Sequence, residues 1–283
     1  MFRPNAGFRP PHPPRPRRGP DAAGEIRQGR RIGYPGAEPR AERAEIMLRM
    51  RVRRVVTTRA GGRSAAPYES FNLGDHVGDQ PSAVRANRQR LAEGIGLTAG
   101  RLVWMEQVHG RTVTTVDGPQ TEPAEATDGL VTNRPGLALV ALVADCVPVL
   151  LADADNGVVA AVHAGRVGAR VGVVPATVAA MVEAGAKADQ IEVLLGPSVC
   201  GECYEVPAAM RDDVEAHLPG SAAKSRKGTP ALDLRAGLWN QLAGLGVARI
   251  GVDPRCTVED KTLFSHRRDG QTGRLAAVTW IEA

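Results

Sequence analysis

Three runs of apolar residues constrain the fold of this chain more than any other feature. Residues 137–143 read Leu-Ala-Leu-Val-Ala-Leu-Val, and residues 147–151 and 158–162 are equally rich in Val, Leu and Ala. A strand with one face in solvent alternates apolar and polar residues, whereas a strand that is buried on both faces does not. These runs therefore predict central strands that are covered on both sides by other layers.

The rest of the chain supplies candidates for those layers. Further strands are expected at residues 54–58, 102–108, 112–116, 129–132, 191–195, 248–252 and 275–281. Helical spacing with Pro, Asp or Gly at the ends predicts helices that follow Asp79, cover residues 170–184, follow Pro207, and run from Asp233 to Gly246. The fold class is therefore α/β, a layered sandwich of mixed β-sheets flanked by helices, in a single domain over residues 47–283.

The first 46 residues differ from the rest. They hold nine of the 21 prolines and ten Arg against five acidic residues, so the net charge of +5 resides there. They show no apolar period, which predicts a disordered Pro/Arg-rich extension, or a start-site artefact if Met47 or Met50 is the initiator. A basic tail for anionic partners is the alternative. Because the remaining charge is balanced, we expect no nucleic-acid partner.

The sequence also limits where the protein works. It has no stretch of about 18 uncharged apolar residues and no apolar segment of a secretory signal near its start. We therefore expect a cytoplasmic protein without membrane contact. The four cysteines are then expected as thiols or metal ligands rather than as disulfides.

Polar residues interrupt the apolar runs at strand ends. His109 closes one predicted strand, Cys146 lies between two apolar runs, and His163 closes another. Loops at strand ends converge in α/β folds, so these three side chains could meet. Two imidazoles and one thiolate suit Zn²⁺ and leave a fourth position open, as in catalytic sites. The spacing matches no local metal motif, so a structural role for each residue stays open.

Ordered motifs add a resemblance. From about Arg54 to its end the chain resembles the YfiH family, also called the multicopper polyphenol oxidase (laccase-like) or LACC-type purine nucleoside phosphorylase family. The matching segments are residues 57–62, 71–74, 76–79, 107–110, 144–148, 163–165, 196–197, 203–206, 233–235, 265–269 and 272–274.

The resemblance implies a layered α/β fold of the YfiH/CNF1-like type and Zn²⁺ bound by His109, Cys146 and His163. It implies phosphorolysis of adenosine, inosine, guanosine and S-methyl-5′-thioadenosine, with adenosine deamination in some members. The partners are then a purine nucleoside and phosphate, and we expect a monomer. Members usually continue His-Ala-Gly with Trp-Arg-Gly, whereas this chain has Arg166-Val167-Gly168. Arg166 is the substrate-binding candidate that could supply the guanidinium from the neighbouring position.

Three more residues are candidates for the site. Arg59 is a catalytic candidate, because it precedes two glycines whose amides could approach an anion. Asn72 could hydrogen-bond a ribose hydroxyl or phosphate, and the alternative is an Asx turn. His76 is a second candidate substrate-lining residue, and the alternative is a local partner of neighbouring aspartates.

Other functions and sites remain as alternatives. Copper-dependent oxidation of phenols, with Cu in place of Zn²⁺, is disfavoured because the chain has no His-x-His pair. A cytoplasmic peptidoglycan-editing factor is a third interpretation. Cys200 and Cys203 resemble half a zinc site or a redox pair that would need Cys256 or another distant ligand. We interpret these thiols as buried or incidental.

Overall fold

The computed structural model describes residues 50–283, so the predicted extension over residues 1–46 lies outside the described residues. The three apolar runs form strands β5 (Ala138–Val143), β6 (Val147–Asp153) and β7 (Val158–Ala164), and every residue in them is buried. β5 belongs to one sheet, whereas β6 and β7 are neighbours in another. The short link between β5 and β6 therefore passes from sheet to sheet.

Both sheets are mixed. The four-stranded sheet has the order β1-β12-β5-β2, with β1 at Val52–Val56, β12 at Leu275–Ile281 and β2 at Leu102–Val103. The six-stranded sheet has the order β11-β8-β6-β7-β4-β3, with β11 at Arg249–Val252, β8 at Glu192–Leu195, β4 at Gly129–Thr132 and β3 at Val113–Thr115. The pairs β2–β5, β3–β4 and β8–β11 are parallel and the other pairs are antiparallel.

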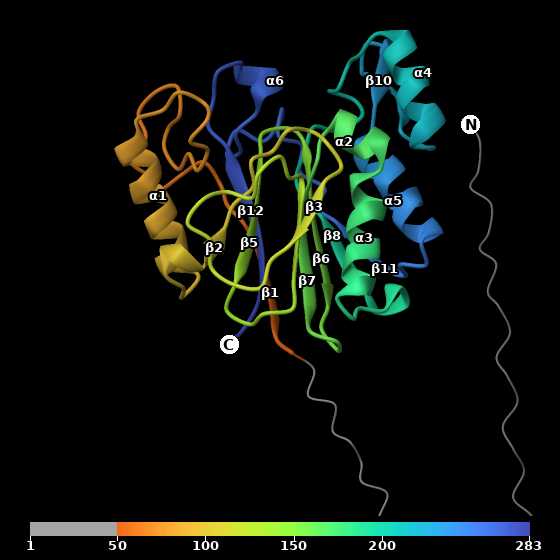
Figure 1. Ribbon diagram of the computed structural model, residues 1–283. Helices are drawn as coiled ribbons and strands as arrows, with labels where there is room; N and C mark the ends of the chain where they lie inside the picture. Colours follow the sequence, from red (N-terminus) through yellow and green to blue (C-terminus); the bar gives the residue numbers. More distant parts are fainter. Residues whose placement is uncertain (1–49) are drawn as a thin grey trace, which may run out of the picture. The chain divides into compact units, whose positions relative to one another are not determined.

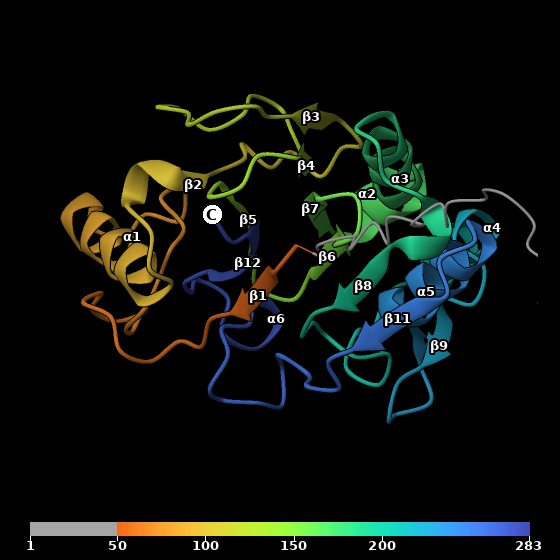
Figure 2. The same cartoon turned by 90° about the horizontal axis from the view of Figure 1, so that it is seen from below.

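The two sheets pack face to face, with helices on their outer faces. Figure 2, which looks along the strands, shows helix α1 (Pro81–Gly94) on the outer side of the four-stranded sheet. On the outer side of the six-stranded sheet lie α2 (Arg166–Val171), α3 (Val173–Glu183), α4 (Ala208–His217) and α5 (Leu234–Gly244). The core between the sheets includes Leu139 and Ala141 of β5 against Leu150 of β6 and Ala161 of β7. The predicted layered α/β sandwich is therefore confirmed.

Small elements complete the described part of the chain. They are the 3₁₀ turns Ala99–Arg101 and Ala188–Gln190, the hairpin of β9 (Ala222–Lys224) and β10 (Pro230–Leu232), and the short helix α6 (His266–Asp269). In Figure 1, α6 and the start of α2 lie at the same end of the strands. No helix within residues 50–283 is long and apolar enough to cross a bilayer.

Some predicted boundaries were wrong. The single helix expected over residues 170–184 is two helices, because Gly172 adopts a left-handed conformation (φ +87°) between α2 and α3. The strand expected over residues 102–108 ends at Val103, and Met105 makes only an isolated bridge to Ala124. Asp79 does not cap α1, because Gln80 holds that position and makes no side-chain cap. Asp233 caps α5 as predicted, accepting a hydrogen bond from the Ala236 amide.

Candidate metal centre and substrate cleft

The link between β5 and β6 presents Cys146 at the strand ends. Asp145, just before it, has a positive φ of 91°, which costs conformational energy for a residue other than glycine. Its carboxylate accepts hydrogen bonds from Thr257 Oγ1 (2.6 Å), Ser265 Oγ (2.7 Å) and the Arg267 amide (2.6 Å). The turn is thus held from the C-terminal part of the chain, and the thiol is fixed where β5 ends and β6 begins.

Asp128 positions the two histidines. It is fully buried directly before β4, and its carboxylate accepts hydrogen bonds from the backbone amides of His109 (3.0 Å) and Gly110 (2.6 Å). It also lies 2.8 Å from Nδ1 of His163, which is buried on β7. A carboxylate on Nδ1 fixes the tautomer and leaves Nε2 as the ligand atom, as in many zinc sites. Asp128 therefore orders one histidine through its ring and the other through its backbone.

The three predicted metal ligands come together. One ligand atom each from His109, Cys146 and His163 can be chosen so that all lie within 4.8 Å of one another. Nε2 of His109 is 4.0 Å from Sγ of Cys146, and the two imidazole rings meet edge to face with centroids 4.7 Å apart. Ligand atoms about 2.0–2.3 Å from a tetrahedral ion lie roughly 3.5 Å from one another. The donor set therefore fits one tetrahedral metal ion with little movement.

Charges at this cluster favour a thiolate. Burial raises the pKa of Cys146, but the His163 charge and a hydrogen bond from His109 outweigh burial and lower it from 9.0 to about 6. Burial likewise lowers the pKa of His163, but the Cys146 thiolate and Asp128 raise it to about 9. Metal binding needs the deprotonated sulfur, so the thiolate is available at neutral pH.

Gly165 leaves room for this cluster. A Cβ at this position would lie 2.8 Å from Cδ2 of His109 and 3.0 Å from Sγ of Cys146. Such contacts would displace two of the three ligands, so the absence of a side chain at Gly165 is a condition of the arrangement. This explains in steric terms why a glycine follows His163-Ala164 at the start of α2.

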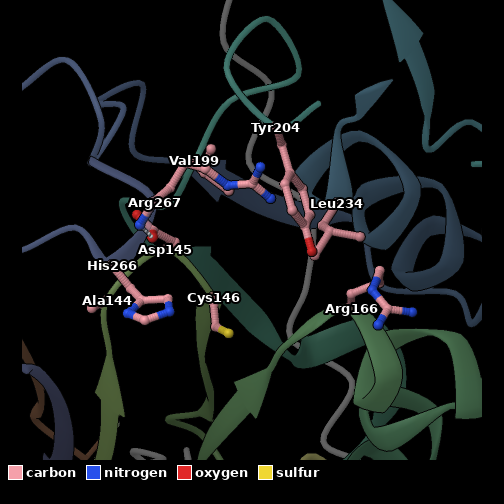
Figure 3. Close-up of a pocket in the computed structure, with 9 residues that line it drawn as sticks. All are labelled: Ala144, Asp145, Cys146, Arg166, Val199, Tyr204, Leu234, His266 and Arg267. Carbon is pink, nitrogen blue, oxygen red and sulfur yellow. Dashed lines mark hydrogen bonds between the residues drawn. The ribbon is translucent and has the colours of Figure 1, made fainter. Parts of the chain in front are cut away.

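The cluster opens onto a cleft with two lobes. A smaller cavity of about 160 Å³ and a larger one of about 330 Å³ share Ala144, Cys146 and His266 as lining residues. The smaller lobe adds Asp145, Arg166, Val199, Tyr204, Leu234 and Arg267, and Figure 3 shows the Tyr204 ring entering it from a loop and Arg166 from a helix. The larger lobe adds His76, Gln107, His109, Leu142, Val143, His163 and Arg274.

Guanidinium groups make the cleft suitable for an anion. Arg267 lies over the Tyr204 ring at 5.1 Å from its centroid, and Arg166 and Arg267 oppose the rise that burial causes in the pKa of Tyr204. Burial lowers the pKa of Arg274, against the attraction of Cys146 and Asp145. Three arginines around one thiol are an arrangement that can bind a phosphate beside a metal ion.

The other predicted site residues divide into two groups. Arg166 and His76 line the cleft. The structure does not bring Arg59 or Asn72 to its walls. The guanidinium of Arg59 donates to the Glu69 carbonyl (2.9 Å) and lies over the Phe264 ring. Asn72 is fully buried and forms the Asx turn, accepting from the Gly74 amide (3.0 Å).

Sequence reasoning missed several residues of the cleft. Tyr204, His266 and Arg274 lie inside the motifs noted above, but nothing in their spacing distinguishes them from surface residues. Asp128 carries a better signal, because it is an acidic residue placed directly before a strand whose four residues are all buried. A buried carboxylate needs hydrogen-bond donors around it, so such a position indicates an aspartate that organises its neighbours.

Comparisons with known proteins show which family this chain resembles. The family described as multi-copper polyphenol oxidoreductase laccase matches residues 53–282. A purine nucleoside phosphorylase of Mycobacterium tuberculosis (strain H37Rv) is 60% identical over 233 residues, which cover 82% of this chain and 93% of the relative. A purine nucleoside phosphorylase of Corynebacterium glutamicum is 60% identical over 232 residues, 81% of this chain and 94% of the relative.

Solved structures share the fold. YlmD from Geobacillus stearothermophilus superposes with a TM-score of 0.78 at 33% identity, covering 82% of this chain and 92% of that one. The hypothetical protein YfiH of Bacillus licheniformis superposes with a TM-score of 0.77 at 30% identity, covering 82% and 93%. The resemblance seen in the sequence is thus confirmed over the described domain.

Proposed function

Because the chain belongs to the multi-copper polyphenol oxidoreductase laccase family, also known as the YfiH family, we propose that it is a zinc-dependent purine nucleoside phosphorylase. The observation that carries the proposal is the cluster of His109, Cys146 and His163, which opens onto a cleft lined by three arginines. The proposed substrates are adenosine, inosine, guanosine and S-methyl-5′-thioadenosine together with phosphate. Adenosine deamination is a proposed second activity of the same cleft, and the protein is proposed to act as a monomer.

Zn²⁺ suits the residues better than copper. His109, Cys146 and His163 would hold the ion and leave one tetrahedral position for an oxygen of substrate or water. Bound there, Zn²⁺ would act as a Lewis acid on that oxygen. Copper electron-transfer sites add a weak axial ligand, usually Met, to two His and one Cys. None of the residues that line either lobe in the described chain is a Met.

The arginines bind the nucleophile in this proposal. Arg166 and Arg267 both line the smaller lobe, where two guanidinium forks can hold the oxygens of a phosphate dianion. Tyr204 packs under Arg267, and the charge of Arg166 opposes the rise in its pKa, so the phenol lies close to both guanidinium groups. The lobe is partly apolar through Val199 and Leu234, which limits competition from water.

The nucleoside is placed in the larger lobe, next to the same thiol. A phosphate oxygen attacks ribose C1′, the bond from C1′ to the purine nitrogen breaks, and the purine leaves with the bonding electrons and gains a proton. His266 lines both lobes, and its Nδ1 donates to the Gly270 carbonyl (2.6 Å). With Nδ1 held by this carbonyl, the imidazolium form of His266 would donate its Nε2 proton to the leaving purine and regain a proton from water afterwards.

A nucleoside panel tests the proposal. Purified full-length protein loaded with zinc is incubated with each nucleoside, with and without phosphate, and products are identified by mass. Phosphorolysis releases the free base and the corresponding sugar 1-phosphate only when phosphate is present, whereas deamination of adenosine gives inosine without it. Free base should be lost after chelation and in Cys146→Ser. Zinc-loaded protein that releases no base from any nucleoside would rule out the phosphorylase.

The arginine assignment has a matched control on the same helix. Arg166→Gln should raise the KM for phosphate at least about tenfold with a smaller change in the KM for nucleoside, because a charge-assisted contact is lost. Arg170→Gln removes a guanidinium that is paired with Asp213 on the surface of α2, and it should leave both values unchanged. Equal effects of the two substitutions would show that Arg166 does not bind phosphate.

Two rival functions are distinguished by further assays. The description of the family names a laccase, so copper-loaded protein is tested for oxidation of phenols with oxygen uptake as the readout. Phenol oxidation without base release would favour the oxidase. A cellular effect on peptidoglycan that survives Cys146→Ser would favour the editing factor.

A further inference from the structure

A second group of metal-ligating side chains lies outside the cluster in the cleft. β8 and β11 are neighbouring parallel strands, so the segments that follow them leave the sheet at the same end. Ser198 and Cys256 form an isolated parallel bridge, and the Cys200 amide lies 3.4 Å from Sγ of Cys256. The fold therefore brings Cys256 to the Cys200–Cys203 turn across 56 residues of sequence.

Local turns aim the remaining groups at the same point. The amides of Cys203 and Tyr204 both donate to the Cys200 carbonyl at 3.0 Å, which closes the Cys-x-x-Cys turn. After Cys256, the amides of Glu259 (3.2 Å) and Asp260 (2.8 Å) donate to the Cys256 carbonyl. One donor atom each from Cys200, Cys203, Cys256 and Glu259 can be chosen so that all four lie within 4.8 Å of one another.

We propose that Cys200, Cys203, Cys256 and Glu259 bind a second zinc ion, separate from the ion of the cleft. Two thiolate sulfurs at about 2.3 Å from a tetrahedral Zn²⁺ lie about 3.8 Å apart, so four donors within 4.8 Å match one ion. Thiolate-rich tetrahedral sets select zinc over harder cations such as Mg²⁺ or Ca²⁺. All three thiols are free in the structure, and their odd number leaves one sulfur unused by any disulfide within the group.

Charge and exposure fit this assignment. Three thiolates and one carboxylate around Zn²⁺ leave a net charge of about −2, which needs a counter-charge nearby. Arg226 supplies part of it, because its Nη2 contacts Glu259, while its Nε is also 2.8 Å from Glu202. Cys256 is buried, while the side chain of Glu259 is 39% exposed. An ion could therefore enter from solvent at Glu259 and be held by a buried thiolate.

The second site would be structural and would support the cleft. Four protein donors close a tetrahedral site, in contrast to the three donors of the cleft. Val199 and Tyr204 directly flank Cys200 and Cys203 in sequence, and both line the smaller lobe. A metal ion bound by Cys200, Cys203 and Cys256 would cross-link this wall of the cleft to the segment around Cys256. The sequence alone suggested incidental thiols, because it did not show that Cys256 and Glu259 reach the turn.

The test uses full-length protein in which Cys146→Ser removes the ion of the cleft, so that it does not depend on the proposed enzymatic function. Zinc is measured by elemental mass spectrometry after gel filtration. We expect one zinc per chain in Cys146→Ser and close to none when Cys203→Ser is added. Cobalt substitution gives a second readout, because sulfur-to-cobalt charge-transfer absorption should persist in Cys146→Ser and disappear in the double variant.

Folding must be controlled, because Cys256 is buried. Cys203→Ser and Glu259→Gln, at half-buried and exposed positions, are therefore the main variants, and thermal unfolding is followed for each. A chelator should lower the unfolding temperature of Cys146→Ser and leave that of Cys146→Ser/Cys203→Ser unchanged. The proposal is overturned if Cys146→Ser binds no zinc, or if Cys146→Ser/Cys203→Ser binds as much zinc as Cys146→Ser.

Discussion

Asp128 is a single carboxylate with four hydrogen-bonding donors around it. It accepts from the amides of residues 108, 109 and 110 and from Nδ1 of His163. Burial raises its pKa, but the hydrogen bonds from His163 and from the Gly110 amide outweigh burial and lower it. The carboxylate therefore stays ionised at neutral pH. Two of the three ligands in the cleft depend on it, although it lines neither lobe.

Asp128→Asn should weaken zinc binding in the cleft by about 10–100-fold, the usual cost of losing a hydrogen-bonding partner of a metal ligand. An amide supports imidazole and backbone donors less well than a carboxylate, and its NH₂ group has no acceptor among these donors. Zinc affinity is measured by competition with a chromophoric chelator. Asp117→Asn, on the exposed surface, is the control. Equal affinities of the two variants would contradict the role given to Asp128.

The lowered pKa of Cys146 predicts a pH dependence for the metal-free protein. With a pKa of about 6, roughly nine-tenths of this thiol is ionised at pH 7, and the thiolate fraction falls as the pH drops through 6. Alkylation by iodoacetamide should therefore be half-maximal near pH 6, and zinc should suppress it. His163→Ala should move the midpoint upward, because the largest attractive charge is lost.

Peptide mass analysis gives the alkylation rates, and the protein contains its own comparison. Burial raises the pKa of Cys203 to about 12, so this thiol should remain unmodified at pH 7. A Cys146 midpoint near 9 would show that the imidazoles do not stabilise its thiolate.

At the scale of elements, the apolar pattern of the sequence predicted the strands that are buried on both faces. β4 and β12 have the predicted bounds, because their residues are buried on both faces and no other structure explains such runs. The early end of β2 and the break at Gly172 were missed, since both depend on neighbours in space. The metal ligands were predicted as strand-end residues and through resemblance. Tyr204 was not, because its loop acquires its position only through the packed sheets.

The break at Gly172 yields a prediction for the helices. Gly172 ends α2 and begins α3 with φ of +87°, a conformation that costs a residue with a Cβ about 1–2 kcal/mol. Gly172→Ala should therefore lower the free energy of unfolding by about that amount, measured by urea denaturation. Gly244→Ala, at the end of α5 with open space around it, should be neutral or slightly stabilising. Equal stabilities would show that α2 and α3 can join without strain.

At the scale of the whole molecule, the described domain holds the core, the cleft and both groups of candidate metal ligands. The family match begins at residue 53, and the net charge of +5 resides in the first 46 residues. We therefore expect the chain of residues 47–283 to unfold at the temperature of the full chain and to keep its activity, measured by calorimetry and the nucleoside assay. It should also lose retention on a cation exchanger. A large drop in the unfolding temperature would assign the first 46 residues a part in the domain.

The link from β5 to β6 has a consequence for how the protein could be tuned. His163 lies on β7 of the six-stranded sheet, and Asp128, directly before β4 of the same sheet, also holds the backbone of His109, whereas Cys146 lies on the link from β5 of the four-stranded sheet. A small slide of one sheet over the other would therefore alter the spacing of the donor atoms. Substitutions at inter-sheet positions such as Leu139 or Leu150 could thus adjust metal affinity from a distance, with no ligand replaced.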